Sequence, residues 1–157
     1  MSNSNELDNR TLSLQRIIDA PLQLVWEAWT QPGHIAHWWG PKGMETKVIE
    51  HDFKVGGSWK FTMEMPNGAE FISEGVFSEI VPLEKIVTSA EFKPMTTGVQ
   101  LQALFEAQGE KTIFTFNVVH PTEAYCQQQE QMGFMNGWGS VFNNLEEYVS
   151  SLANEKD

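Results

Sequence analysis

Histidine, cysteine and glutamate side chains are the first candidates for chemistry, because they serve as metal ligands, nucleophiles or proton-transfer groups. His34 and His37 are three residues apart and would share one side of a short helix. A metal site needs further ligands, and the sequence places neither His51 nor His120 beside this pair. The chain has no His-Glu-x-x-His motif and no paired cysteines, so we predict no metal site.

Cys126 is the only cysteine, which excludes an intrachain disulfide and indicates a reducing compartment. Its surroundings (YCQQQEQ) contain no basic residue to lower the pKa of the thiol. We therefore expect Cys126 not to act as a nucleophile.

Glutamates within strands are candidate acids or bases if they face an interior. Glu91 and Glu106 lie opposite the apolar faces of their strands, so we expect them in solvent, whereas the pattern around Glu74 is ambiguous. The chain has no Gly-x-Ser-x-Gly elbow and no phosphate loop. We predict no catalytic residue and no cofactor.

Aromatic side chains form the most informative cluster. Five of the six tryptophans lie between Ala20 and Met65. Such a set either walls an apolar chamber or fills one side of a large core. Trp38 and Trp39 are adjacent, so on a helix they point about 100° apart and cannot both be buried in one face. We expect one to pack inward, and the other either to close the mouth of a cavity or to lie under a loop.

Periodicity predicts the elements that position these side chains. Residues 11–19 alternate as a strand with one buried face. Pro21 opens a helix that ends at Pro32 and Gly33, and a second short helix carries residues 35–38 until Gly40 and Pro41 break it. About six antiparallel strands follow. The segments with the clearest alternation are 58–65, 71–80, 85–92, 99–105 and 112–118, with turns at 66–68, 81–83 and 108–110.

The C-terminal segment changes to a helical period. Its apolar stripe consists of Met135, Trp138, Phe142, Leu145, Val149 and Leu152. Thr122 is the expected N-cap of this long helix. Three glycines, at 133, 137 and 139, indicate either a bend or a close approach to the backbone. Strands with one apolar face and a long apolar helix predict an α+β fold, a curved antiparallel sheet gripping the terminal helix.

Bulk composition limits the partners. A chain of 157 residues with net charge −11 is unsuited to nucleic acid or an anionic membrane surface. It has no signal-peptide pattern and no apolar run of membrane-spanning length, so we expect a cytoplasmic protein. We expect a frayed N-terminus over residues 1–10, a single domain over 11–152 and a tail over 153–157.

Several segments in a specific order resemble one family. They are IIDAPLQLVWEAWTQPGHIAHWW, WGPKG, VGGSWKFTM, EGVFSEIVPLEKIV, KTIFTFNVV and GWGSVFNNLEEYVSSL, which together span about residues 11–152. The chain resembles the SRPBCC (START-like, birch-pollen-allergen-like) superfamily, and within it the family named after activators of the ninety-kilodalton heat-shock chaperone's ATPase. The eukaryotic activator has an additional N-terminal domain that has no counterpart in this sequence.

This resemblance implies a helix-grip fold of seven antiparallel strands, with an apolar cavity between the sheet and the terminal helix. Superfamily members bind lipids, sterols or other hydrophobic molecules, and some are enzymes. The expected cavity contacts converge from the short helices, two strands and the terminal helix. They are Trp38, Trp39, Trp59, Phe61, Met63, Phe114, Phe116, Met135, Trp138 and Phe142. The alternative is that these side chains simply fill the core.

Three hypotheses follow for function. The first is binding of a small hydrophobic or aromatic molecule in the internal cavity. The second is a cyclase- or hydrolase-like enzyme that uses a polar cavity residue. The third is a protein-interaction module, either a chaperone co-factor or a homodimer.

Overall fold

The computed structural model describes residues 9–39, 46–64, 68–93 and 96–156, and in them a seven-stranded antiparallel sheet of order β1-β7-β6-β5-β4-β3-β2. The strands are β1 (Thr11–Ile18), β2 (Thr46–His51), β3 (Ser58–Glu64), β4 (Glu70–Val81), β5 (Lys85–Lys93), β6 (Thr96–Gln108) and β7 (Lys111–Val119). The helices are α2 (Leu22–Thr30), α3 (Pro32–Trp38), α4 (Glu123–Gln131) and α5 (Phe134–Lys156). The predicted fold class, an α+β helix grip, is confirmed.

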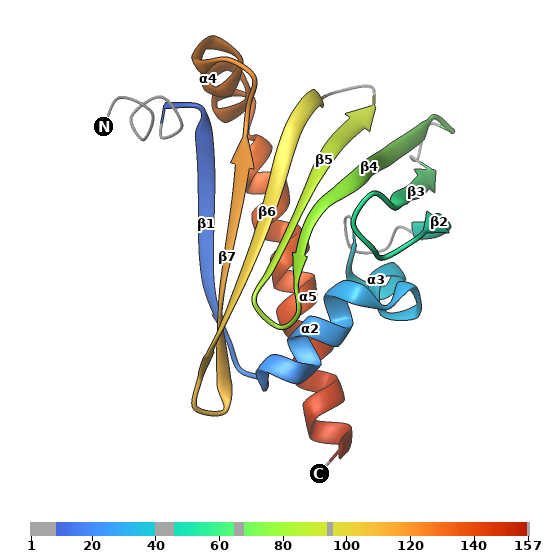
Figure 1. Cartoon of the computed structure of the whole chain (residues 1–157), viewed down its shortest axis with the longest axis vertical. Helices are drawn as coiled ribbons and strands as arrows, with labels where there is room; N and C mark the ends of the chain where they lie inside the picture. Colours follow the sequence, from blue (N-terminus) through green and yellow to red (C-terminus); the bar gives the residue numbers. More distant parts are fainter. Residues whose placement is uncertain (1–8, 40–45, 65–67, 94–95, 157) are drawn as a thin grey trace.

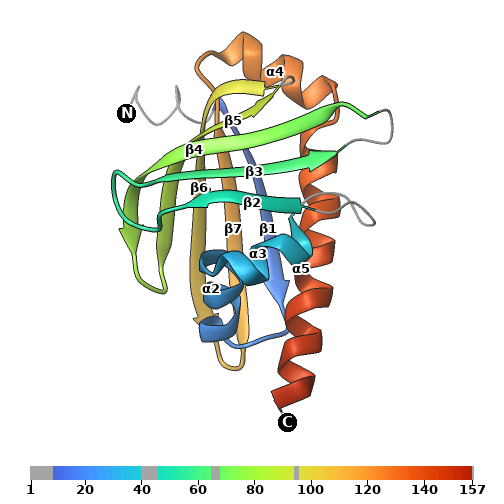
Figure 2. The same cartoon turned by 90° about the vertical axis from the view of Figure 1, so that its right-hand side faces the viewer.

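The sheet curves around α2, α3 and α5, which pack on one side of it. Figure 1 shows α5 crossing this face, with α2 and α3 near its C-terminal half, and Figure 2 shows the strands curling around them. Three irregularities in strand pairing add to the curvature, because a β-bulge bends its strand and increases the twist. They lie between Val48 and Glu50, between Phe77 and Glu79, and between Ala90 and Phe92.

The sequence did not locate β2. Its bulge breaks the period-two pattern, and Ile49 at the bulge is 58% exposed. An apolar residue that faces solvent in a six-residue strand leaves too few positions for alternation to be recognised. The second short helix also begins earlier than predicted, at Pro32, which occupies a position favourable for proline in a first helical turn.

The predicted terminal helix is two helices. Thr122 does cap the first, since its hydroxyl oxygen accepts a hydrogen bond from the backbone N–H of Tyr125 at 3.1 Å. Gly133 follows with a φ of 82°, which ends α4, and α5 then continues to Lys156. Arg16 also approaches the backbone closely, because its Nη2 donates to the carbonyl of Gly139 at 3.3 Å. A break and a close approach therefore both occur.

The predicted turns that lie within the described residues are present. Gly109 joins β6 to β7 with a φ of 61°, and Leu83, between β4 and β5, has a φ of 64°. The predictions on residues 1–8, on Gly40 and Pro41, and on 66–67 fall outside the described residues. No helix in the described ranges is long and apolar enough to cross a membrane.

Candidate functional site

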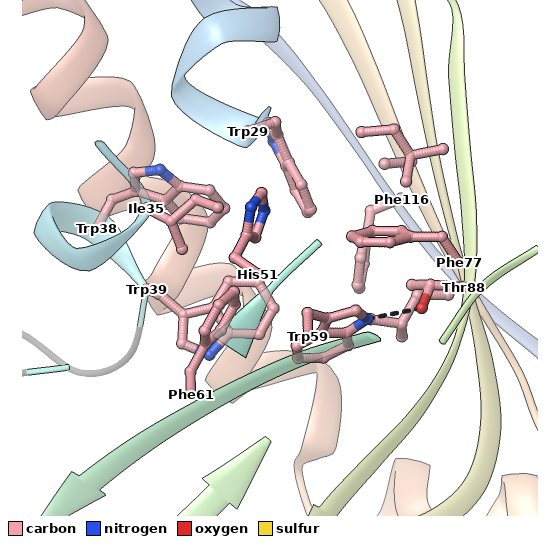
Figure 3. A pocket seen from close by; sticks show the side chains of 13 residues that line it. Trp29, Ile35, Trp38, Trp39, His51, Trp59, Phe61, Phe77, Thr88 and Phe116 are labelled. Atoms are coloured by element: carbon pink, nitrogen blue, oxygen red, sulfur yellow. Dashed lines mark hydrogen bonds between the residues drawn. The ribbon is translucent and has the colours of Figure 1, made fainter. Parts of the chain in front are cut away.

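A pocket lies between the two short helices and the concave face of the sheet (Figure 3). Its wall combines side chains from α2, the α3 segment and strands β2 to β7. They are Trp29, Ile35, Trp38, Trp39, His51, Trp59, Phe61, Phe77, Ile86, Thr88, Leu101, Ala103 and Phe116. The surface of the pocket is almost entirely apolar.

The pocket is small and partly open. Its cavity volume is about 30 Å³, and the empty space including the open mouth is about 450 Å³. The cavity proper has room for about two water molecules, whereas a cavity of about 150 Å³ holds benzene. The aromatic rings therefore occupy most of the space that the sequence led us to expect as a chamber.

The position of the pocket also differs from the expectation. We expected a cavity against the terminal helix, but no described residue of α5 lines the pocket. Trp138 and Phe142 of α5 pack directly on Phe116, with ring centroids 4.6 and 4.8 Å apart. These contacts close the space between α5 and β7, so that the remaining gap lies under α2 and α3.

The structure brings five of the ten predicted contact residues to the pocket: Trp38, Trp39, Trp59, Phe61 and Phe116. The other five lie elsewhere in the interior. Phe114, Trp138 and Phe142 belong to the packed core, Met63 is buried on β3, and Met135 is partly buried against the core. A ligand contact by any of the ten stays a prediction.

Sequence reasoning missed Trp29 and His51 among the lining residues. Trp29 lies on the buried, apolar face of α2, a position that fits core packing equally well. His51 lies at the end of the strand that the sequence did not locate. Its place beside the pocket depends on long-range strand pairing.

Trp38 and Trp39 are both buried, with exposures of 1% and 7%, and both line the pocket. The prediction that they could not share one buried face was wrong. Its premise was a helix through both residues, but α3 ends at Trp38, and Trp39 has an extended backbone with φ −72° and ψ 122°. Because the backbone changes direction between the two residues, both rings point into the pocket.

The indole N–H groups of the four pocket tryptophans differ in their partners. Trp29 Nε1 is buried and has no acceptor among the described residues. The other three each donate a hydrogen bond: Trp38 to the carbonyl of Ala28 at 2.9 Å, Trp39 to Ser73 Oγ at 3.4 Å, and Trp59 to Thr88 Oγ1 at 2.7 Å (Figure 3). A buried N–H without an acceptor is uncommon in folded proteins, so Trp29 needs an explanation.

His51 is the ionisable side chain among the described lining residues. Its ring stacks on Phe53 and Phe61, with centroids 6.0 and 6.2 Å apart. Burial lowers the pKa of His51 below its ordinary value, and this effect outweighs the opposing ones of its own backbone and of Asp52. The imidazole is therefore mainly neutral at pH 7, as suits an apolar wall.

His34 and His37, the histidine pair on α3, lie outside the pocket. His34 Nδ1 and the hydroxyl of Tyr148 are 2.6 Å apart, and His37 stacks on the ring of Tyr148 at 5.0 Å. The two histidines do share one side of α3, as predicted, and there they join α3 to α5. Within the described ranges no cluster of three or more His, Cys, Asp or Glu side chains is arranged to hold a metal ion.

The remaining chemical candidates are not in the pocket. Glu74, Glu91 and Glu106 are absent from its lining. Cys126 is buried on α4, and burial, with smaller effects of Glu130 and Glu123, raises the pKa of its thiol. A raised thiol pKa disfavours the nucleophilic thiolate.

Solved structures of other proteins share this architecture. A crystal structure of a Nitrosomonas europaea protein is 25% identical with a TM-score of 0.78, covering 91% of this chain and 96% of that one. A Mycobacterium smegmatis protein is 20% identical with a TM-score of 0.82, covering 94% and 95%. A solution structure described as an AHSA1-like protein, from Aeromonas hydrophila, is 22% identical with a TM-score of 0.73, covering 90% and 93%.

A comparison with curated proteins found no match. The sequence model of one family, described as "Activator of Hsp90 ATPase homolog 1-like protein", matches residues 19–150. This match includes the two short helices, six of the seven strands and most of α5. The chain therefore belongs to the family of proteins like activator of Hsp90 ATPase homolog 1.

Proposed function

We propose that this protein binds a small, ring-shaped apolar molecule in the pocket beneath α2 and α3. The observation that carries the proposal is an apolar pocket that is partly open to solvent and walled mainly by aromatic rings. Aromatic walls bind flat apolar guests by burial of surface and by ring stacking. Most ligand pockets combine such a wall with a few polar groups, which this wall also has in Trp29 and His51.

The cavity must enlarge to accept a benzene-sized guest, because its resting volume is about 30 Å³. His51 is the side chain best placed to allow this. It is half-buried and stands in a stack with Phe53 and Phe61 rather than in an enclosed core. Rotation of a half-exposed ring disturbs fewer contacts than rotation of a fully buried one.

Toluene tests the proposal directly. We expect saturable binding, measured by tryptophan fluorescence and by a rise in melting temperature that depends on toluene concentration. Ala103→Val fills the pocket from β6 and should abolish binding. Ala107→Val is the matched control, since Ala107 is exposed on the same strand and should leave binding unchanged. Absence of saturable binding to the wild-type protein would contradict the proposal.

The other hypotheses remain predictions. Among the described lining residues His51 is the one side chain that titrates near neutral pH, and it has no acidic or cysteine neighbour in the lining. Chaperone stimulation and homodimerisation can be measured by a chaperone ATPase assay and by sedimentation. The cytoplasmic location expected from the sequence likewise awaits measurement.

A further inference from the structure

The indole N–H of Trp29 is the starting point. Trp29 is 9% exposed, its Nε1 is buried, and no described residue accepts its hydrogen bond. Leaving a buried donor unsatisfied destabilises a protein, because the group loses its hydrogen bonds to water and gains none in return. Three other tryptophans line the same pocket, and each donates its N–H to a protein oxygen. The unmatched donor is therefore specific to one position in the wall.

The surroundings of Trp29 are rich in aromatic rings, which include Trp38 at 4.9 Å and Phe114 at 5.4 Å between centroids. No described residue among its neighbours accepts the N–H. Figure 3 shows the indole hanging from α2 into the pocket, with its nitrogen on the edge nearer His51 than Phe116. Because Nε1 itself is buried, an acceptor in the pocket reaches this N–H only when the pocket enlarges around Trp29, which lines it.

Resting on the binding function proposed above, we propose that Trp29 makes the pocket selective for aromatic molecules that carry a hydrogen-bond acceptor oxygen, such as a carbonyl. The ring of the ligand replaces water against the apolar wall, and its oxygen accepts from Trp29 Nε1. Polar ligands that lack a ring lose the apolar burial, and hydrocarbons leave the donor unsatisfied.

Two probes of the same shape isolate this hydrogen bond. Acetophenone carries a carbonyl oxygen where α-methylstyrene carries a methylene group. The alkene is the more hydrophobic of the two, so the informative quantity is the ratio of their dissociation constants in different variants. Each ratio cancels changes in pocket size that affect both probes, as in a double-mutant cycle.

Trp29→Phe removes the donor, and we expect it to reduce the affinity of acetophenone relative to α-methylstyrene about fivefold, the worth of one neutral hydrogen bond. Trp26→Phe is the matched control. It makes the same truncation on the same helix, α2, but Trp26 does not line the pocket. Its ratio should equal that of the wild-type protein.

The wild-type protein gives a second readout that does not depend on a folded variant. With ¹⁵N-labelled tryptophan, the indole N–H resonance of Trp29 should move downfield with acetophenone and not with α-methylstyrene, because hydrogen bonding deshields the proton. One result overturns the inference but leaves the binding function standing. In it both probes bind, the ratio of their dissociation constants is the same in all variants, and the Trp29 resonance does not shift. A water molecule retained on Trp29 gives that same result. Failure of both probes to bind contradicts the binding function itself.

Discussion

Two regions of this molecule are built from the same kinds of apolar and aromatic side chain, but one is closely packed and the other contains a cavity. The packed half comprises β1, β7 and α5, where Phe114, Phe142 and Leu145 are 0% exposed. The pocket half comprises α2, α3 and β2 to β5, and side chains of β6 and Phe116 of β7 complete its wall. There the aromatic rings leave a cavity, and one indole N–H has no acceptor among the described residues. Hydrophobic composition therefore does not decide where a protein leaves space.

Strand pairing also differs between the two halves. β1 pairs with β7 in unbroken register from Thr11 opposite Val119 to Ile18 opposite Thr112, and β7 pairs with β6 without a shift. In the pocket half β3 pairs with β4 without a shift, but the pairings β2–β3, β4–β5 and β5–β6 each contain one. Bulges bend a sheet and splay its side chains, so rings on the bent part cannot interdigitate as closely.

The largest expected effect compares one phenylalanine from each half. Phe142→Ala should lower the free energy of unfolding by about 4 kcal/mol, the usual loss for a fully buried ring. Phe77→Ala should cost about 2 kcal/mol, because part of its ring already faces the cavity and has fewer contacts to lose. Urea denaturation measures both, and equal losses would contradict the division into two halves.

The same change, glycine to alanine, is expected to have opposite effects on stability in the two halves. A Cβ on Gly75 of β4 would lie 1.9 Å from the carbonyl oxygen of Ser89, so Gly75→Ala should cost about 2 kcal/mol through displaced backbone. Gly137 on α5 has nothing within 4 Å of that position. Gly137→Ala should instead stabilise by up to about 1 kcal/mol, because alanine is the better helix former. Thermal unfolding of both variants measures the two signs.

Acid should weaken the pocket half through His51. The pKa of His51 is lowered in the folded protein, so its contribution to stability is complete above the unfolded value of 6.5 and declines as the pH falls below it. We expect the melting temperature to fall between pH 7.5 and 5.5. His51→Phe should reduce that fall but not remove it, since burial also lowers the pKa of His120. An equal fall in His51→Phe would exclude His51 as a cause.

The smallest effect concerns two ion pairs. Arg16 on β1 and Glu146 on α5 are 3.0 Å apart with about a third of each side chain exposed, and Arg16 also donates to Asn143 at 2.7 Å. Lys85 and Glu79 in the pocket half are 3.3 Å apart and more exposed. Double-mutant cycles should give a coupling of about 0.5–1 kcal/mol for the first pair and close to zero for the second. A larger coupling in the pocket half would reverse the comparison.

Much of the fold was predictable because its signals are local. Alternation located six strands, Thr122 marked a helix start, and Gly109 marked a hairpin. Five pocket residues were also predicted, since aromatic side chains on the inner face of a strand or helix have few other places to lie. The strand β2 escaped because its bulge interrupts the alternation that reveals a strand.

The sequence by itself determined the curved sheet, its helices and the apolar character of the interior, since these depend on periodicity within single segments. Only the tertiary structure decided that Trp38 and Trp39 share one wall, that α5 closes its part of the interior, and that the N–H of Trp29 meets no acceptor among the described residues. The reason is physical. Alternation specifies which face a side chain takes, but the depth it reaches and the partners it meets depend on bulges and pairings between distant segments.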